Sequence, residues 1–152
     1  HTFDVVGEML HLVNKYDIPI KLLELEITET TDSEGVSDVV QKMKDAGFTM
    51  LMDDFGSGYS SLNMLQKTQF DVLKIDRGFL SEFMESSRGR KIISHTISMS
   101  RDIGLDIIAE GVETPEQASF LSDCGCDSAQ GFYYSKPITQ EEFDKMLVEV
   151  NK

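Results

Sequence analysis

Acidic residues follow most of the short apolar runs of this chain. Segments 22–29, 50–54, 72–76 and 107–113 each pass from apolar residues into one or more carboxylates. Strands of a parallel sheet all end at one rim, so these carboxylates would gather there. Two unit charges about 4 Å apart repel by roughly 4 kcal/mol at an effective dielectric near 20, so the cluster needs cations or shared protons. We therefore predict a divalent-metal site.

One of these segments continues into 53–61, where the consecutive carboxylates Asp53 and Asp54 precede a glycine-rich loop. Consecutive strand residues point to opposite faces, but at a fraying strand end or a bulge both can reach one site. Their hard oxygen atoms suit Mg²⁺, Mn²⁺ or Ca²⁺. The Asp-Phe-Gly triplet also occurs in protein kinases, but this chain has neither their His-Arg-Asp loop nor their glycine-rich nucleotide loop. Taken alone, the segment fits a flexible turn as well as it fits a metal site.

Composition narrows the function classes. The 152 residues are about one domain's length, and 40% hydrophobic with 27% charged residues is typical of a folded protein. The net charge of −13, without a cluster of Lys and Arg, argues against a DNA duplex as partner. No apolar stretch approaches the 18 or so residues of a membrane span, and no signal peptide is evident. We expect a cytoplasmic protein with no membrane segment.

Helical and strand patterns alternate along the chain. Helices are predicted over 3–16, 38–44, 90–102, 115–123 and 140–150, and strands over 22–28, 48–52, 72–75, 105–109 and 126–130. Segments 114–117 and 139–142 fit capping boxes, and Gly47, Gly104 and Gly125 fit helix ends. Such alternation predicts an α/β fold with a parallel sheet. A closed eight-unit barrel needs about 250 residues, so the sheet is open or a front section is missing.

Five motifs stand in a fixed order. They are Glu26-Ile27-Thr28-Glu29, the segment 53–62, Lys74-Ile75-Asp76, the segment 109–114, and Gln130-Gly131-Phe132 with Lys136-Pro137. Together they closely resemble the signatures of EAL-domain cyclic di-GMP phosphodiesterases. The resemblance implies a partial TIM-like β/α barrel of about five units, with residues 1–152 the C-terminal portion of a single EAL domain. It also implies hydrolysis of cyclic di-GMP to linear pGpG with two Mg²⁺ or Mn²⁺ ions.

The resemblance also implies roles for individual residues. The metal ligands would be Glu26, Asp53, Asp54 and Glu110. The catalytic residues would be Lys74, which orients the attacking water, with Asp53, Glu110 and Gln130. Glu29 would anchor the loop 55–61, and Glu113 would lie behind the metal ligands or beside the substrate. Without the resemblance, Glu26 and Glu110 can be read as surface carboxylates just as well as metal ligands. Lys74 can likewise be read as a structural salt-bridge partner of Asp76 or Glu110.

Two features of the family are absent from this sequence. The Glu-Ala-Leu motif and an asparagine ligand are missing, so we expect about 100 residues of barrel before His1. A sheet stopped partway exposes an edge, so we expect a homodimer or edge-paired self-association, and little or no turnover by the chain alone. The alternative function is a degenerate, non-catalytic EAL module that binds cyclic di-GMP or a protein partner.

Overall fold

The computed structural model describes residues 4–28, 35–58 and 61–150 of the chain. The helices are α1 (Val5–Lys15), α2 (Val36–Asp45), α3 (Ser61–Lys67), α4 (Arg77–Met84), α5 (Ser87–Asp102), α6 (Pro115–Asp123) and α7 (Gln140–Val150), with a short 3-10 helix η1 (Ile20–Leu22). The strands are β1 (Glu24–Thr28), β2 (Thr49–Phe55), β3 (Val72–Ile75), β4 (Asp106–Ala109) and β5 (Ser128–Ala129).

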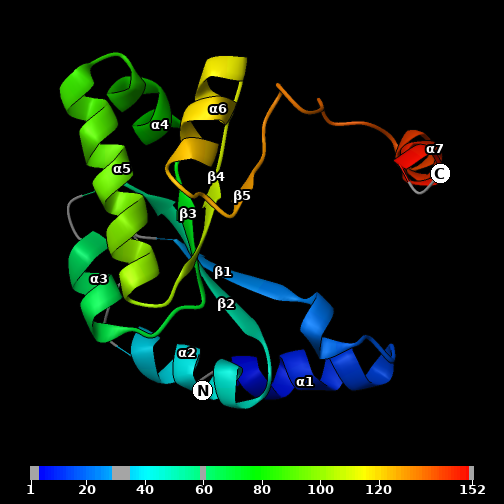
Figure 1. The fold of residues 1–152 in the computed structure, drawn as a ribbon. Helices are drawn as coiled ribbons and strands as arrows, with labels where there is room; N and C mark the ends of the chain where they lie inside the picture. Colours follow the sequence, from blue (N-terminus) through cyan, green and yellow to red (C-terminus); the bar gives the residue numbers. More distant parts are fainter. Residues whose placement is uncertain (1–3, 29–34, 59–60, 151–152) are drawn as a thin grey trace.

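The five strands form one parallel sheet in the order β1-β2-β3-β4-β5. The order in space repeats the order in the chain, so every crossover turns the same way and the helices gather on one face. A doubly wound sheet, by contrast, reverses its order and carries helices on both faces. Figure 1 shows α2, α3, α5 and α6 along one side of the sheet, with α7 standing apart. The predicted α/β fold with five parallel strands is confirmed.

The helix-covered face of the sheet buries two neighbouring apolar clusters. The first joins α1, α2 and α3 to the sheet and includes Val40, Met43, Met50, Met52 and Leu73. The second joins α4, α5 and α6 to the sheet and includes Ile75, Leu80, Ile93, Ile97 and Ile107. Full burial of one such side chain stabilises the fold by roughly 1.5–3 kcal/mol. These clusters therefore fix which face of each strand meets the helices.

The opposite face of the sheet receives the polar residues. Successive side chains of a strand point to opposite faces. Because Met52 and Leu73 belong to the first cluster, Asp53 and Lys74 point away from the helices. A slip of one residue in strand register would move the apolar side chains to the opposite face of the sheet. Burial of the apolar side chains against the helices therefore also determines the face to which the polar side chains point.

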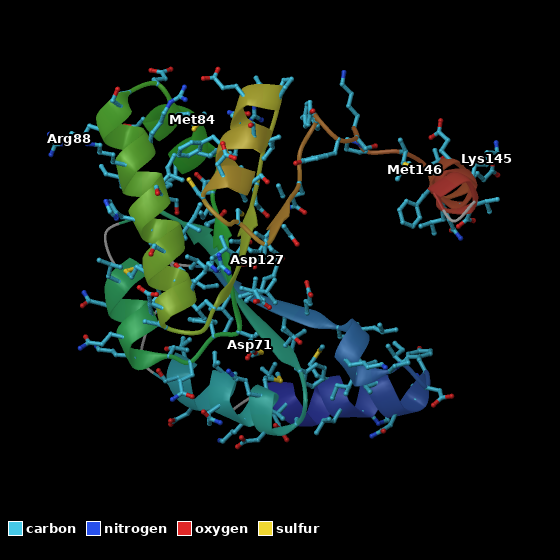
Figure 2. The ribbon with its side chains drawn as sticks, in the orientation of Figure 1. Asp71, Met84, Arg88, Asp127, Lys145 and Met146 are labelled. Carbon is cyan, nitrogen blue, oxygen red and sulfur yellow. The ribbon has the colours of Figure 1, made fainter. Side chains whose placement is uncertain are left out.

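Two aspartates tie neighbouring strands together at the amino end of the sheet (Figure 2). Asp71 precedes β3 and accepts a hydrogen bond of 2.9 Å from the backbone N–H of Met50 in β2. Asp127 precedes β5 and accepts one of 2.9 Å from the backbone N–H of Ile107 in β4. Lys44 of α2 pairs with the second oxygen of Asp71 at 2.7 Å. The same device thus fixes the register of two strand pairs.

The helix ends follow the sequence signals. Thr114 and Gln117 form the expected capping box at the start of α6, and Thr139 pairs with Glu142 in the same way at α7. The three glycines expected after helices have positive φ angles, of 99° at Gly47, 84° at Gly104 and 80° at Gly125. None of the helices in the described part of the chain has the length and apolar character that crossing a membrane requires.

Several element predictions were incomplete. Helices α3 and α4 were not predicted, α2 and α5 begin earlier than expected, and β2 runs on to Phe55. Strand β5 is shorter than the predicted 126–130. Asp76 explains the unexpected start of α4, since its Oδ1 accepts hydrogen bonds from the backbone N–H groups of Gly78 (2.8 Å) and Phe79 (3.1 Å).

Candidate active site

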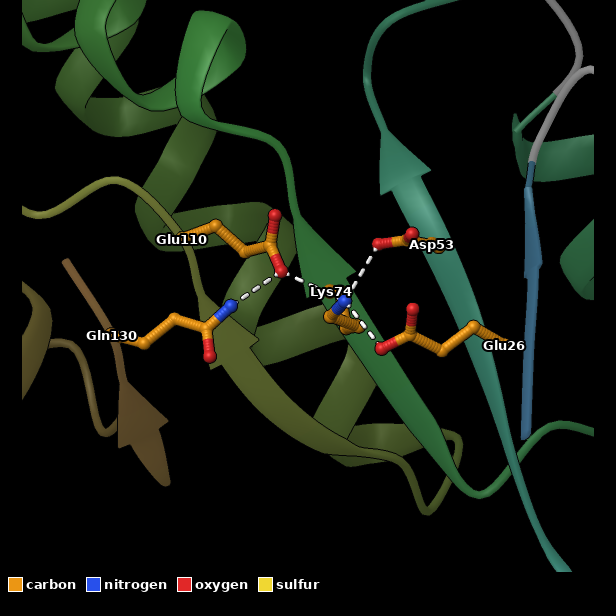
Figure 3. Close-up of polar contacts among 5 residues, drawn as sticks. All are labelled: Glu26, Asp53, Lys74, Glu110 and Gln130. Atoms are coloured by element: carbon orange, nitrogen blue, oxygen red, sulfur yellow. Dashed lines mark hydrogen bonds and ion pairs between the residues drawn. The ribbon is translucent and has the colours of Figure 1, made fainter. Parts of the chain in front are cut away.

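Polar side chains that lie in, or directly follow, the five strands meet at the carboxyl end of the sheet (Figure 3). Glu26, Asp53 and Lys74 lie in β1, β2 and β3 on the face turned away from the helices. Glu110 directly follows β4, and Gln130 directly follows β5. The parallel arrangement is what brings together residues that are distant in sequence.

Lys74 lies at the centre of this group. Its Nζ is 2.6 Å from Glu26 Oε1, 2.9 Å from Asp53 Oδ1 and 2.8 Å from Glu110 Oε1. The lysine side chain is 8% exposed, whereas that of Glu26 is 46% exposed. The salt bridge between Lys74 and Glu110 is one of the two structural contacts that residue types alone allowed. The other possible partner, Asp76, caps α4 instead.

The electrostatics of the cluster favour a charged lysine. Burial lowers the pKa of Lys74, but its contacts with Glu110, Glu26 and Asp53 outweigh burial, and the pKa is raised above its ordinary value. Lys74 is therefore an ammonium at neutral pH. Three carboxylates share this one ammonium, which leaves the four groups with a formal charge of −2.

Gln130 extends the network on one side. Its Nε2 donates a hydrogen bond of 2.7 Å to Glu110 Oε1, the same oxygen that contacts Lys74. This second donor fixes the direction of the Glu110 carboxylate. Gln130 therefore positions an acidic residue of the cluster, in addition to any contact it makes with a water or a substrate.

Asp54 sits on a bulge beside the cluster. Leu51 and Met52 of β2 pair with β3 in register, but the register shifts before Phe55, which pairs with Ile75. Asp54 has φ 58°, a left-handed conformation that aspartate tolerates better than most residues. Burial, and then repulsion from Asp53, raises the pKa of Asp54. The sequence allowed either a fraying strand end or a bulge here, and the structure has the bulge. Asp54 is outside the ion pairs of Lys74 among the described residues.

Glu113 lies apart from the ion-paired cluster and faces a neighbouring cavity. Its Oε1 pairs with an Nη of Arg77 at 2.6 Å. The cavity is about 550 Å³ and is lined by Arg77, Glu110, Glu113, Gln130, Phe132 and Lys136, among others. Gly111 has φ 65°, and a Cβ at this position would overlap the Arg77 side chain. The absence of a side chain at Gly111 is what lets Arg77 reach Glu113.

Arg77 lines this cavity and pairs with Glu113, and the sequence analysis did not indicate it. A possible signal was its place directly after Asp76, since an aspartate cap would start a helix with Arg77 in its first turn. Glu29 is outside the described residues, as are residues 59–60 of the loop 55–61 that it was expected to anchor. That role stays a prediction.

A comparison with models of protein families shows the family of this chain. A family model for the EAL domain matches residues 3–137. The chain belongs to the EAL domain family. The match covers the five strands and all the site residues described above.

Individual EAL relatives are similar over most of this chain. Cyclic di-GMP phosphodiesterase NbdA of Pseudomonas aeruginosa is 33% identical over 146 residues, which cover 94% of this chain and 19% of that protein. The solved EAL domain of Mycobacterium smegmatis DcpA has a TM-score of 0.88 at 34% identity, over 97% of this chain and 68% of that one. A manganese and cyclic di-GMP complex of Klebsiella pneumoniae BlrP1 has a TM-score of 0.81 at 31% identity, over 90% of this chain and 36% of that one.

Two facts follow from these similarities. EAL domains are TIM-like barrels, so the predicted TIM-like β/α architecture is confirmed. The chain also spans less than a quarter of the length of the curated relatives that head the comparison.

The residue types at this site suit a divalent metal ion, but the described side chains are not placed around a common metal position. Within residues 4–28, 35–58 and 61–150, no three His, Cys, Asp or Glu side chains are arranged as ligands of one ion. The carboxylates surround Lys74 instead. Their oxygen atoms and formal charge of −2 nevertheless fit a divalent cation. Asp53 Oδ1 also suits a role as a cation ligand. This oxygen is buried and has no hydrogen-bond partner among the described residues, since its contact with Lys74 is an ion pair without good hydrogen-bond direction.

Proposed function

We propose that this EAL domain serves in the divalent-metal-dependent hydrolysis of cyclic di-GMP to linear pGpG. The observation that carries the proposal is the meeting of Glu26, Asp53, Lys74 and Glu110 at one end of the sheet. NbdA, a relative matched over 94% of this chain, is named as a cyclic di-GMP phosphodiesterase, which supports the same substrate.

The acidic residues are proposed to hold the metal. Glu26, Asp53, Asp54 and Glu110 would bind two Mg²⁺ or Mn²⁺ ions, both of which accept carboxylate ligands. When bound, such ions supply positive charge that offsets the phosphodiester and acidifies water. The manganese in the BlrP1 complex supports this choice of metals.

The other polar residues are proposed to act on water and substrate. Lys74 is a buried hydrogen-bond donor, and we assign it the orientation of the attacking water. Gln130 would hold Glu110 in place beside that water through its 2.7 Å hydrogen bond. Glu113 would face the substrate, because it lines the same cavity as Glu110 and Gln130. Glu29 would anchor the loop 55–61.

The 152-residue chain on its own is expected to turn over little or no cyclic di-GMP. Glu26 is nearly half exposed, and within the described sheet β1 and β5 each have a neighbour on one side only. We propose that residues 1–152 are the C-terminal portion of a single EAL domain and that the open edges favour a homodimer or edge-paired self-association. A cytoplasmic location remains part of this proposal.

The full gene product allows a matched test of the proposed site. Glu26 and Glu24 lie two residues apart in β1 and therefore point to the same face, but only Glu26 reaches Lys74 among the described residues. With Mg²⁺ or Mn²⁺, the unaltered protein and Glu24→Gln should convert cyclic di-GMP to pGpG. Glu26→Gln should lose about 100-fold or more in rate, as should the unaltered protein after chelation. Chromatography of the nucleotides measures all four.

Two results would contradict the proposal. Equal rates for Glu26→Gln and Glu24→Gln would show that the carboxylate cluster is not the site. Binding of cyclic di-GMP without hydrolysis by the full gene product, with either metal, would favour a non-catalytic EAL module.

A further inference from the structure

Lys74 lies between the three carboxylates to which the proposed function assigns a cation. Its Nζ contacts one oxygen from each of three carboxylates, at 2.6 Å for Glu26, 2.9 Å for Asp53 and 2.8 Å for Glu110 (Figure 3). These three carboxylates come from, or directly follow, three different strands. Without a positive charge between them, they would repel one another across the end of the sheet.

The ammonium and a divalent cation need the same atoms. Carboxylate oxygens also bind Mg²⁺ and Ca²⁺, so a cation held by these three residues would need the oxygen atoms that now meet at Nζ. Two positive centres cannot share that point, because their repulsion rises steeply at such distances. Either the ammonium moves or the cation is excluded.

The lysine can move without disturbing the sheet. Strand β3, which carries Lys74, is held on both sides by β2 and β4. The lysine side chain, however, is a flexible four-carbon stem ending in a compact charge. A rotamer change can therefore withdraw the ammonium while the carboxylates on the flanking segments keep their places.

We propose that Lys74 is an internal competitor of the divalent cation. Its ammonium holds Glu26, Asp53 and Glu110 together in the metal-free protein and withdraws from at least one of them when a cation binds. The inference rests on the proposed function, since it takes these carboxylates as the cation's ligands. It gives Lys74 a positioning role that is separate from orienting a water.

The test compares cation affinity in two lysine variants of the full gene product. Lys74→Met keeps most of the apolar stem and removes the charge. Lys44→Met is the matched control, because Lys44 also pairs with an aspartate but at the opposite end of the sheet. Mn²⁺ binding is measured at one fixed pH by the electron paramagnetic resonance signal of the free ion. Lys74→Met should bind Mn²⁺ about tenfold more tightly than the unaltered protein. Lys44→Met should bind Mn²⁺ as tightly as the unaltered protein does.

Thermal unfolding supplies a second readout that does not involve activity. In the metal-free protein, Lys74→Met should lower the melting temperature, because three carboxylates then face one another without a counter-charge. Addition of Mn²⁺ should raise the melting temperature of Lys74→Met by more than that of the unaltered protein. In Lys44→Met, the rise caused by Mn²⁺ should equal that of the unaltered protein.

The outcomes separate this inference from the proposed function. If the unaltered protein binds Mn²⁺ and Lys74→Met binds Mn²⁺ equally well or more weakly, then Lys74 does not compete with the cation. The proposed function stands in that case. If the unaltered protein binds no Mn²⁺, both are overturned.

A measurement on the unaltered protein covers the case in which Lys74→Met does not fold. The ¹⁵N signal of the Lys74 ammonium should be visible in the metal-free protein, since three carboxylates shield it from exchange with water. It should shift as Mg²⁺ is added, with the same midpoint as Mg²⁺ binding, while the Lys44 signal stays still. A Lys74 signal that does not move at saturating Mg²⁺ would overturn the inference.

Discussion

At the scale of single residues, the site is organised by one buried positive charge. Lys74 is 8% exposed and paired with three carboxylates, so the loss of any one partner changes the balance of the whole cluster. Breaking a buried pair by removing one partner costs about 3–5 kcal/mol in other proteins. The cluster is therefore sensitive both to substitution and to the arrival of another cation.

Asp54 provides a test of the negative charge that surrounds this lysine. Its pKa is raised by burial and by repulsion from Asp53 and Asp76. An aspartate whose pKa is raised in the folded protein lowers the free energy of unfolding at any pH at which it is ionised in both the folded and the unfolded state. This penalty disappears as the pH falls below the pKa of the aspartate in the unfolded state. Asp54→Asn should therefore stabilise the metal-free protein at pH 7, by up to about 1 kcal/mol because solvent screens a partly exposed charge. Urea denaturation measures the difference.

Asp17→Asn is the matched control for this substitution. Asp17 also has a positive φ, of 51°, so both variants change the local backbone preference in the same way. The advantage of Asp54→Asn over Asp17→Asn should shrink as the pH approaches 3. Equal effects of the two substitutions at pH 7 would contradict the electrostatic explanation.

The sequence could predict which acids converge but not what they converge on. Strand ends predicted that acidic residues gather at one rim, and the family resemblance selected Glu26, Asp53 and Glu110 among them. The central position of the Lys74 ammonium depends on side-chain rotamers and on relative burial, which no spacing in the sequence encodes. The link from Arg77 to Glu113 depends on a close approach over Gly111 and is equally hidden.

At the scale of elements, the register of the strands decides where the site residues stand. The bulge at the end of β2 adds one residue opposite β3, and Asp71 and Asp127 fix the amino ends of two strand pairs. Both devices act through backbone groups, so they hold the strands independently of the charged cluster at the other end of the sheet.

The aspartate ties can be removed one at a time. Asp127→Ala should lower the free energy of unfolding by about 1–2 kcal/mol, because the Ile107 N–H loses its acceptor. Asp71→Ala should cost more, since it also removes the ion pair with Lys44. Asp123→Ala, an exposed change at the end of α6, is the control and should stay within about 0.5 kcal/mol. Chemical denaturation measures the free energy of unfolding of the three variants. Equal losses for Asp127→Ala and Asp123→Ala would show that the hydrogen bond from Ile107 to Asp127 does not stabilise the sheet.

Long helices were predictable, and short helices were not. Helices α1, α6 and α7 carry regular apolar spacing or capping boxes, and their predicted bounds lie close to those observed. Helices α3 and α4 have seven and eight residues, which is too short for an apolar period to repeat clearly. Burial of Met64 in α3 and of Leu80 and Met84 in α4 stabilises them, together with the Asp76 cap of α4.

At the scale of the whole molecule, apolar and backbone surfaces remain open. Within the described sheet β1 and β5 each pair on one side only, and α7 stands apart from the rest in Figure 1. Phe143 and Met146 on α7 are 46% and 41% exposed. Unpaired strand edges and exposed apolar residues both favour association with another surface.

Self-association of the 152-residue chain is the expected result of these open surfaces. Light scattering should give a mass above the 17.1 kDa of one chain. If α7 contributes, Phe143→Ser with Met146→Ser should shift the population toward the monomer. Glu141→Ser with Asp144→Ser, which has the same spacing on the same helix, should not. A monodisperse monomer of the unaltered chain would show that the open edges do not pair.

The most direct test of the central claim is anomalous diffraction from crystals of the full gene product grown with Mn²⁺. We expect a manganese peak bounded by Glu26, Asp53 and Glu110, with the Lys74 ammonium displaced from at least one of them. A fully occupied manganese elsewhere, with all three ion pairs of Lys74 intact, would contradict a metal-dependent hydrolase built on this cluster.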